Sequence, residues 1–202
     1  MSDLPSFLLV LFAIFLFSAF VKCVTTFGIL RYGLGIHGSG INIALFVASL
    51  VLSIMILAPQ IESSGGISGL FNHPPKTFEE LDNKFSPILT KYTDKGLLEK
   101  LTESAKRLKG TEQEKEVKLH SDTQFSVLSA AFIITELRDA FKIGFLILIP
   151  FLVIDLIVLN ILLLLGANNI SCTLVSLSFK ILLLFAIDGW GMLSDKLING
   201  YI

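Results

Sequence analysis

The sequence predicts an all-α membrane protein in which two long apolar helical hairpins flank a small helical extramembrane segment. Four apolar runs predict the hairpins, because each reaches or approaches the length that crosses a hydrocarbon core of ~30 Å. Only 16% of the 202 residues are charged, against about 25% in a typical soluble domain. Most of these charges lie between residues 62 and 122, which separates the first two runs from the last two.

Three segments follow from this pattern. Residues 1–61 form the first hairpin, residues 62–124 the charged helical segment, and residues 125–202 the second hairpin with a C-terminal amphipathic tail. The link between the first two runs carries Lys22 and Arg31 and no acid. Bases in short loops favour the cytoplasmic side, so we expect the charged segment and both termini outside the cytoplasm.

The first hairpin begins with a charge-free run, Leu4–Val21, which Ser2 or Asp3 can cap. A signal peptide needs a basic stretch before its apolar region, and Asp3 is the only early charge, so we expect an uncleaved membrane segment. The second run is Ile41–Ile61. The link between the two runs contains a GxGxxG motif at Gly33, Gly35 and Gly38, but a dinucleotide fingerprint needs a preceding strand. Apolar helical runs flank this motif, which predicts a flexible turn instead.

The charged segment predicts three amphipathic helices. The first begins at a capping box formed by Thr77 and Glu80, Pro87 restarts the second, and the third ends at Gly110. Stripes of this kind are typical of packing or docking faces, and the mixed charges after Gly110 predict a solvated loop. The stripes are Phe78, Leu81 and Phe85, then Ile88, Leu89 and Tyr92, and finally Leu97, Leu98, Leu101, Ala105 and Leu108.

The second hairpin follows a short apolar stretch, 125–134, and a charged collar in which Asp139 and Lys142 are helix neighbours. Its two runs are Ile143–Leu165 and Ile170–Ile187, joined by a polar turn at 166–169. Pro150 cannot donate a backbone hydrogen bond, which predicts a kink. Trp190 and Tyr201, in the tail, suit a membrane interface or packing.

Each run of the second hairpin carries one charged residue, Asp155 in the first and Lys180 in the second. Both stand about 19 Å from the turn at ~1.5 Å per residue, and therefore at the same height. A lone charge in a membrane is costly, and opposite charges at one depth neutralise each other. We therefore predict a structural ion pair, within one chain or between chains. The alternative is that each residue meets a separate neighbour.

No pattern in the sequence predicts catalysis, a cofactor or a metal site. The histidines are far apart, and Cys23 and Cys172 read as small buried hydrophobes. The formal net charge of −1 gives no broad attraction to nucleic acid. An intramembrane Asp155 could also serve a proton relay, but a relay needs further titratable groups along a path, so the structural pair is favoured.

Several stretches resemble the core export-gate family of type III secretion, which comprises FliP of flagella and SctR (YscR, SpaP) of injectisomes. The spacing from the IPFLVIDL stretch at Ile149–Leu156 to Asp188-Gly189-Trp190 is the most specific part, and the likeness covers nearly the whole chain. The other matching stretches are Leu30-Arg31, Leu34-Gly35, Asn42, Ala58-Pro59, Lys91–Lys95, Glu136-Leu137, Ala140-Phe141, Ile143–Phe145, Phe179-Lys180 and Leu184-Phe185.

The resemblance implies an all-helical, non-enzymatic subunit of a gate that conducts unfolded protein substrates. Five copies are expected to join four copies of a second small membrane protein and one of a third. The assembly is expected in the bacterial inner membrane, in contact with lipid and largely on its periplasmic side. The two other readings are an intramembrane proton-coupled carrier or enzyme centred on Asp155, and a scaffold that nucleates assembly without conducting.

The family places a methionine cluster after the glycine that matches Gly166, as a gasket for the pore. This chain has Ala167, Asn168 and Asn169 there, so a methionine seal does not transfer. The candidate pore loop is therefore Leu165 to Asn169, with Leu162 to Leu165 as the source of apolar closure. Two proline sites of the family are also replaced, by Ser171-Cys172 and by Ser178, and Gly40-Ile41 stands where a proline-rich motif is usual.

Overall fold

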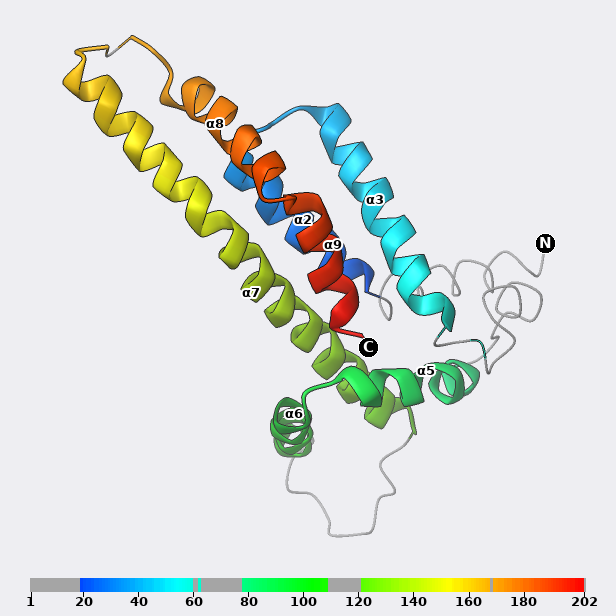
Figure 1. Ribbon diagram of the computed structural model, residues 1–202. Helices are drawn as coiled ribbons and strands as arrows, with labels where there is room; N and C mark the ends of the chain where they lie inside the picture. Colours follow the sequence, from blue (N-terminus) through cyan, green and yellow to red (C-terminus); the bar gives the residue numbers. More distant parts are fainter. Residues whose placement is uncertain (1–18, 60–61, 63–77, 109–120, 168, 202) are drawn as a thin grey trace. The chain divides into compact units, whose positions relative to one another are not determined.

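The computed structural model describes residues 19–59, 62, 78–108, 121–167 and 169–201, and the regular elements in these ranges are helices (Figure 1). No strand occurs among them, so the all-α prediction is confirmed. Most of the first expected run, with Thr77 and Gly110, lies outside the described residues. The helices are α2 (Phe20–Leu34), α3 (Ser39–Leu57), α5 (Phe78–Tyr92), α6 (Lys95–Leu108), α7 (Ser121–Leu164), α8 (Cys172–Ala186) and α9 (Gly189–Asn199).

Contacts divide the chain into two compact units. Unit 1 takes the described residues within 1–21 and 51–138, and unit 2 takes 22–50 and 139–202. Helices α3 and α7 therefore contribute residues to both units. The expected segment boundaries at 61 and 124 concern placement across a membrane, and they stay a prediction.

Unit 1 is held together by buried apolar side chains from α3, α5 and α7. Phe85 and Leu89 lie one helical turn apart on α5, on the stripes that the sequence predicted. A fully buried side chain of this size stabilises the fold by roughly 1.5–3 kcal/mol. The cluster consists of Leu57, Phe85, Leu89, Phe125, Leu128 and Phe132, with Ile88, Tyr92, Leu98 and Ile133 packed against it.

Helix α5 runs without interruption through Pro87, so the expected restart of the helix at this residue is wrong. A proline inside a helix costs about 3 kcal/mol because it removes one hydrogen bond and its ring crowds the preceding turn. Phe85 and Leu89 are buried in the core on either side of this proline, whose own ring is exposed. Their burial holds both halves of α5 in one helix.

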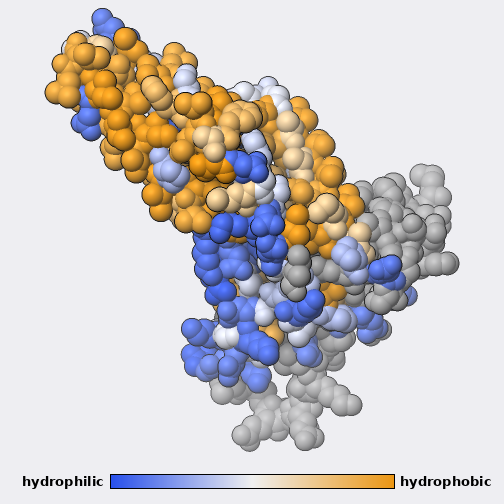
Figure 2. All heavy atoms as spheres, viewed as in Figure 1, coloured by the Kyte–Doolittle hydropathy of each residue, from blue (hydrophilic) through white to orange (hydrophobic). Residues whose placement is uncertain are grey.

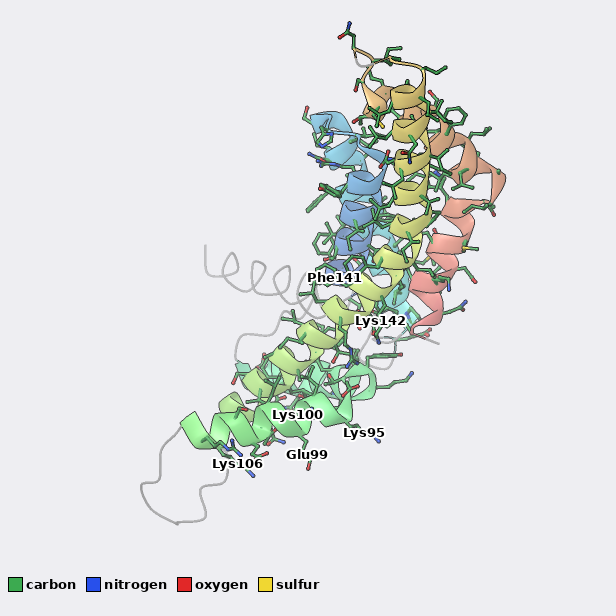
Figure 3. The ribbon with its side chains drawn as sticks, turned by 90° about the vertical axis from the view of Figure 1, so that its left-hand side faces the viewer. Lys95, Glu99, Lys100, Lys106, Phe141 and Lys142 are labelled. Carbon is green, nitrogen blue, oxygen red and sulfur yellow. The ribbon has the colours of Figure 1, made fainter. Side chains whose placement is uncertain are left out.

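Helix α6 begins at an Asp94 cap. The Leu97 backbone N–H donates to Asp94 Oδ1 at 2.8 Å, and the Arg138 guanidinium on α7 donates to Asp94 Oδ2 at 3.0 Å. Such a cap satisfies an amide that the first helical turn leaves without a partner. Charged side chains are exposed along α6, as Figure 3 shows for Lys95, Glu99, Lys100 and Lys106.

Helix α7 is longer than the sequence predicted. The short apolar stretch, the charged collar and the first run of the second hairpin form one helix of 44 residues. Nothing between residues 121 and 143 breaks a helix, and the collar supports it through the predicted neighbour contact, with Lys142 Nζ 3.0 Å from Asp139 Oδ1. Helix α7 continues through Pro150, and the kink there stays a prediction.

The described residues contain two helices that are long and apolar enough to cross a membrane, Ser39–Leu57 and Gln124–Leu164. A third span exists if α8 and α9, which meet at a bend of 62°, count as one. The fourth expected span falls on the first run, most of which lies outside the described residues. Figure 2 shows a largely apolar surface over α8 and the part of α7 that leads to the hairpin tip, as expected of a membrane protein.

Candidate functional site: a helical hairpin with a buried ion pair

The tip of the α7–α8 hairpin is a chain reversal encoded by Gly166. Its backbone is left-handed, with φ +67°, a conformation that glycine adopts without steric cost. The Gly166 N–H donates to the Leu163 carbonyl at 3.1 Å, and the Ala167 N–H donates to the Leu162 carbonyl at 2.9 Å. This pair of bonds is a Schellman motif, which closes the end of α7.

The tip exposes apolar side chains. Leu164 is 88% exposed and Leu165 is 73% exposed, and no atom would lie within 4 Å of a Cβ added at Gly166. Asn169 is also exposed, whereas Asn168 lies outside the described residues. Within unit 2, Leu165 and Gly166 of the candidate pore loop are therefore not packed against neighbouring helices.

Further down the hairpin the structure brings the two predicted charges together. Lys180 Nζ on α8 lies 2.7 Å from Asp155 Oδ2 on α7. The two helices run antiparallel from the tip (Figure 1), which places equal distances along the chain side by side. The ion pair therefore forms within one chain.

The two partners of this pair differ in burial. The Lys180 side chain is 3% exposed and the Asp155 side chain is 35% exposed. The outward neighbours of Asp155 on α7 are apolar and exposed, and they include Leu152 and Leu156. The ammonium group is therefore enclosed by protein, and the carboxylate reaches an apolar surface.

The Lys180 ammonium has a second partner, which the sequence analysis missed. It donates to the backbone carbonyl of Gly33, in the last turn of α2, at 2.7 Å. Helix α2 ends in its own Schellman motif, in which Gly35 N–H donates to the Tyr32 carbonyl at 3.0 Å and Ile36 N–H donates to the Arg31 carbonyl at 3.4 Å. The first two glycines of the GxGxxG motif, Gly33 and Gly35, thus lie at the end of a helix beside a buried lysine.

Two glycines allow α2 and α7 to approach closely. A Cβ at Gly33 would lie 2.8 Å from Leu148 Cδ1 and 2.9 Å from Phe151 Cδ2. A Cβ at Gly144 would lie 2.5 Å from Ile29 Cδ1. Both distances are shorter than real Cβ contacts, so only glycine fits at these positions without a shift of the neighbours.

A second lysine of unit 2 is buried near the chain's C-terminal end. Lys22 on α2 is 3% exposed, and its Nζ lies 4.2 Å from the centroid of the Tyr201 ring. This geometry is a cation–π contact. The sequence analysis counted Lys22 as a base of a short loop, whereas the structure places it inside a helix and in packing. Trp190 packs against Phe27, with ring centroids 6.2 Å apart.

The remaining candidates are located as follows. Cys23 is buried and Cys172 is half-buried, and neither forms a disulfide. Among the residues that the structure describes, no group of three or more His, Cys, Asp or Glu side chains could hold a metal ion. The sequence could have placed Gly33 in the last turn of a helix, because Gly35, two residues later, is a typical helix-ending glycine. No local pattern indicates that Lys180 donates a hydrogen bond to the Gly33 carbonyl.

Comparison with known families matches residues 4–197 to the FliP family. The surface presentation of antigens protein SpaP of Shigella flexneri is 32% identical over 212 aligned positions, which cover 100% of this chain and 94% of that protein. The flagellar biosynthetic protein FliP of Caulobacter vibrioides is 31% identical over 189 positions, covering 91% and 68%. The Yop proteins translocation protein R of Yersinia pestis is 32% identical over 191 positions, covering 91% and 87%.

Proposed function

The chain belongs to the FliP family, and on that premise we propose that it is a core membrane subunit of a type III protein export apparatus. In this role it forms part of a gate that conducts unfolded protein substrates and makes or breaks no covalent bond. The observation that carries the proposal is the family match over residues 4–197. The relatives named for flagellar biosynthesis and for Yop translocation support it.

Assembly with other subunits is part of the proposal. Five copies of this chain join about four copies of a second small membrane protein and one of a third in the bacterial inner membrane. The exposed apolar surface of α7 and α8 supports this (Figure 2), because large exposed apolar patches favour association with partners or lipid. Native mass spectrometry of the chain in mild detergent tests it. The expected species are a homo-pentamer or a larger hetero-complex, and a stable, well-folded monomer without partners in the membrane would contradict it.

The candidate conducting element is the hairpin tip, Leu165 to Asn169. Its exposed leucines can form an apolar constriction when several copies assemble around an axis, in place of the methionine gasket of relatives. A substrate stalled during export should crosslink to a photoreactive residue at Ala167. A matched probe at Ser104 on α6, which is also exposed, should not react. Assembly and secretion with no crosslink at the tip would favour the scaffold reading over a conducting one.

The ion pair is proposed to stabilise the hairpin rather than to carry protons. Asp155 is bonded to a buried lysine at 2.7 Å, which a structural pair explains without a proton path. The alternative, a proton-coupled carrier, makes a distinct prediction. Proton flux in vesicles that Asp155→Asn abolishes, while the complex still assembles, would favour the carrier.

The charged segment is proposed to lie on the periplasmic side, because Arg31, in the last turn of α2 beside the link to α3, favours the cytoplasm. A cysteine at Ser104 should react with a membrane-impermeant thiol reagent in cells whose outer membrane is permeable to it. Reaction only after the inner membrane is opened would reverse this topology.

A further inference from the structure

We infer that Lys180 is a positioning residue for the end of α2, in addition to being the partner of Asp155. Its ammonium group donates to Gly33 O and to Asp155 Oδ2, both at 2.7 Å. These two acceptors come from different helices, α2 and α7, and Lys180 itself lies on α8. One side chain therefore joins three helices of unit 2, independently of any role in export.

The last turn of α2 contains backbone carbonyls that need hydrogen-bond donors from outside the helix. A helix leaves its last four carbonyls without intrahelical donors. The Schellman motif supplies donors for the Arg31 and Tyr32 carbonyls, and the Gly33 carbonyl, one residue further on, accepts from Lys180. A cation at a helix C-terminus is also favoured by the helix dipole. The ammonium group thus closes the end of α2 at a place where water is excluded.

Two glycines make the contact possible. Gly33 has no side chain between its backbone and α7, where a Cβ would collide with Leu148 and Phe151. Gly35 turns the chain with φ +76° and lies against α8, because a Cβ there would be 3.0 Å from Thr173 Cγ2. The end of α2 consequently packs against both helices of the hairpin. The short link from α2 to α3 begins at this contact, so the hairpin determines the position of the first residues of the link.

This inference differs from a simple ion pair in one measurable way. If Lys180 only neutralised Asp155, replacing both residues with neutral ones would restore the arrangement, because no orphan charge would remain. If Lys180 also holds α2, the double replacement still removes the ammonium donor to Gly33 O. The Asp155→Asn single variant, by contrast, keeps that donor.

The test places spin labels at two exposed positions, Tyr32 on α2 and Leu174 on α8, in the full-length chain in nanodiscs. Cys172 is replaced by serine, and Cys23 is buried. The distance distribution is measured by pulsed electron paramagnetic resonance. We expect one narrow maximum for the otherwise unmodified chain and for Asp155→Asn. The Lys180→Met variant and the Asp155→Asn/Lys180→Met variant should both lose it. A double variant as narrow as the unmodified chain would overturn the inference.

A second measurement needs no substitution at the site, so it remains decisive if the lysine variants do not fold. Lysine labelled with ¹⁵N at Nζ is combined with carbonyl-¹³C glycine and amide-¹⁵N leucine. The leucine label restricts the signal to glycine–leucine steps, of which Gly33-Leu34 is one. Solid-state NMR should detect a lysine Nζ in direct contact with such a glycine carbonyl. Absence of this contact in the folded chain would overturn the inference.

Discussion

Helices α2 and α7 end in the same way but in different surroundings. Each is closed by a Schellman motif with a left-handed glycine, Gly35 at φ +76° and Gly166 at φ +67°. At the end of α2 a buried lysine binds the last turn, and neighbouring helices fill the space around it. At the end of α7 nothing lies within 4 Å of a Cβ added at Gly166, and Leu164 is 88% exposed.

The comparison separates what the local sequence decides from what tertiary packing decides. A glycine in the C′ position is sufficient to reverse the chain at both ends. Whether that end is held depends on residues far away in sequence, here Lys180 and Phe151. The end of α2 is therefore a fixed point of unit 2, whereas the α7 tip has no comparable contact among the described residues of this unit.

Breaking the ion pair at the fixed end should have the largest effect. Removing one member of a buried pair typically costs about 3–5 kcal/mol. We expect Lys180→Met to reduce complex yield on native gels more than Asp155→Asn does, because Lys180→Met removes the donor to Gly33 O as well as the partner of Asp155. Replacing both should recover part of the loss, but not all of it, because Gly33 O still lacks its donor. Swapping the two charges should recover less than the double replacement does.

The control is the exposed pair between Arg107 and Glu103 on α6. Exposed pairs are worth about 0–1 kcal/mol, so Arg107→Met should leave the complex yield unchanged. Normal assembly of both single variants at the buried pair would show that Asp155 and Lys180 do not depend on each other.

Crowding the fixed end should have the next largest effect. Gly33→Ala adds a methyl group that would collide with Leu148 and Phe151, and overpacking of this kind costs roughly 1–3 kcal/mol. Gly28→Ala is the matched control on the same helix, because a Cβ there meets nothing within 4 Å. Alanine is a better helix former than glycine by about 0.8–1.0 kcal/mol. Melting temperatures should therefore shift in opposite directions, and a rise in both would refute the close approach of α2 and α7.

Replacing each of the two left-handed glycines with alanine compares the stability of the two helix ends directly. Left-handed backbone costs a residue with a Cβ about 1–2 kcal/mol, and this cost applies to Gly35→Ala and Gly166→Ala alike. Gly35→Ala also presses on Thr173, whereas Gly166→Ala meets open space. Thermal unfolding should show the larger loss for Gly35→Ala. Equal losses would mean that packing adds nothing at the end of α2.

The Asp94 cap at the start of α6 should make a smaller, pH-dependent contribution to the stability of unit 1. The Leu97 backbone N–H and then the Arg138 side chain lower the pKa of Asp94 below its ordinary value of 3.8. Because the folded state favours the charged form, this stabilisation is present above pH 3.8 and is lost as the pH falls through the lower folded-state pKa. Asp94→Asn keeps a capping side chain but does not titrate. The melting temperature of the unmodified chain should therefore fall further between about pH 5 and pH 3 than that of the variant; parallel curves would exclude the effect.

Much of the fold could be predicted from the sequence, because apolar runs and helical stripes are local patterns. The second hairpin, its turn and the stripe through Phe85 and Leu89 are of this kind. The continuity of α7 and α5 could not be predicted, because neither a charged collar nor Pro87 ends a helix that packing holds on both sides. Lys22 was assigned to a loop for a similar reason, since its burial beside Tyr201 depends on the far end of the chain.

At the site, the contact between Asp155 and Lys180 could be predicted because both lie on one antiparallel hairpin with a short turn. Their equal spacing from the turn fixes their heights in any such hairpin. The third partner, Gly33, could not be predicted, because α2 is remote in sequence. The acceptor is also a backbone carbonyl, which every residue has, so the residue type does not mark it. The GxGxxG motif lies in the right region, although Gly33 serves close packing and Gly35 serves helix closure.

Hydrogen–deuterium exchange at the two helix ends tests the central claim most directly, namely that one end is held and the other is left free. The amides of Gly35 and Ile36 and those of Gly166 and Ala167 make equivalent Schellman bonds, so a difference in exchange reports the surroundings. In the isolated full-length chain in detergent, the α2 amides should exchange more slowly than the α7 amides. In the assembled complex, protection should rise mainly at Gly166 and Ala167. Equal exchange at the two ends of the isolated chain, or no gain at the tip on assembly, would contradict this account.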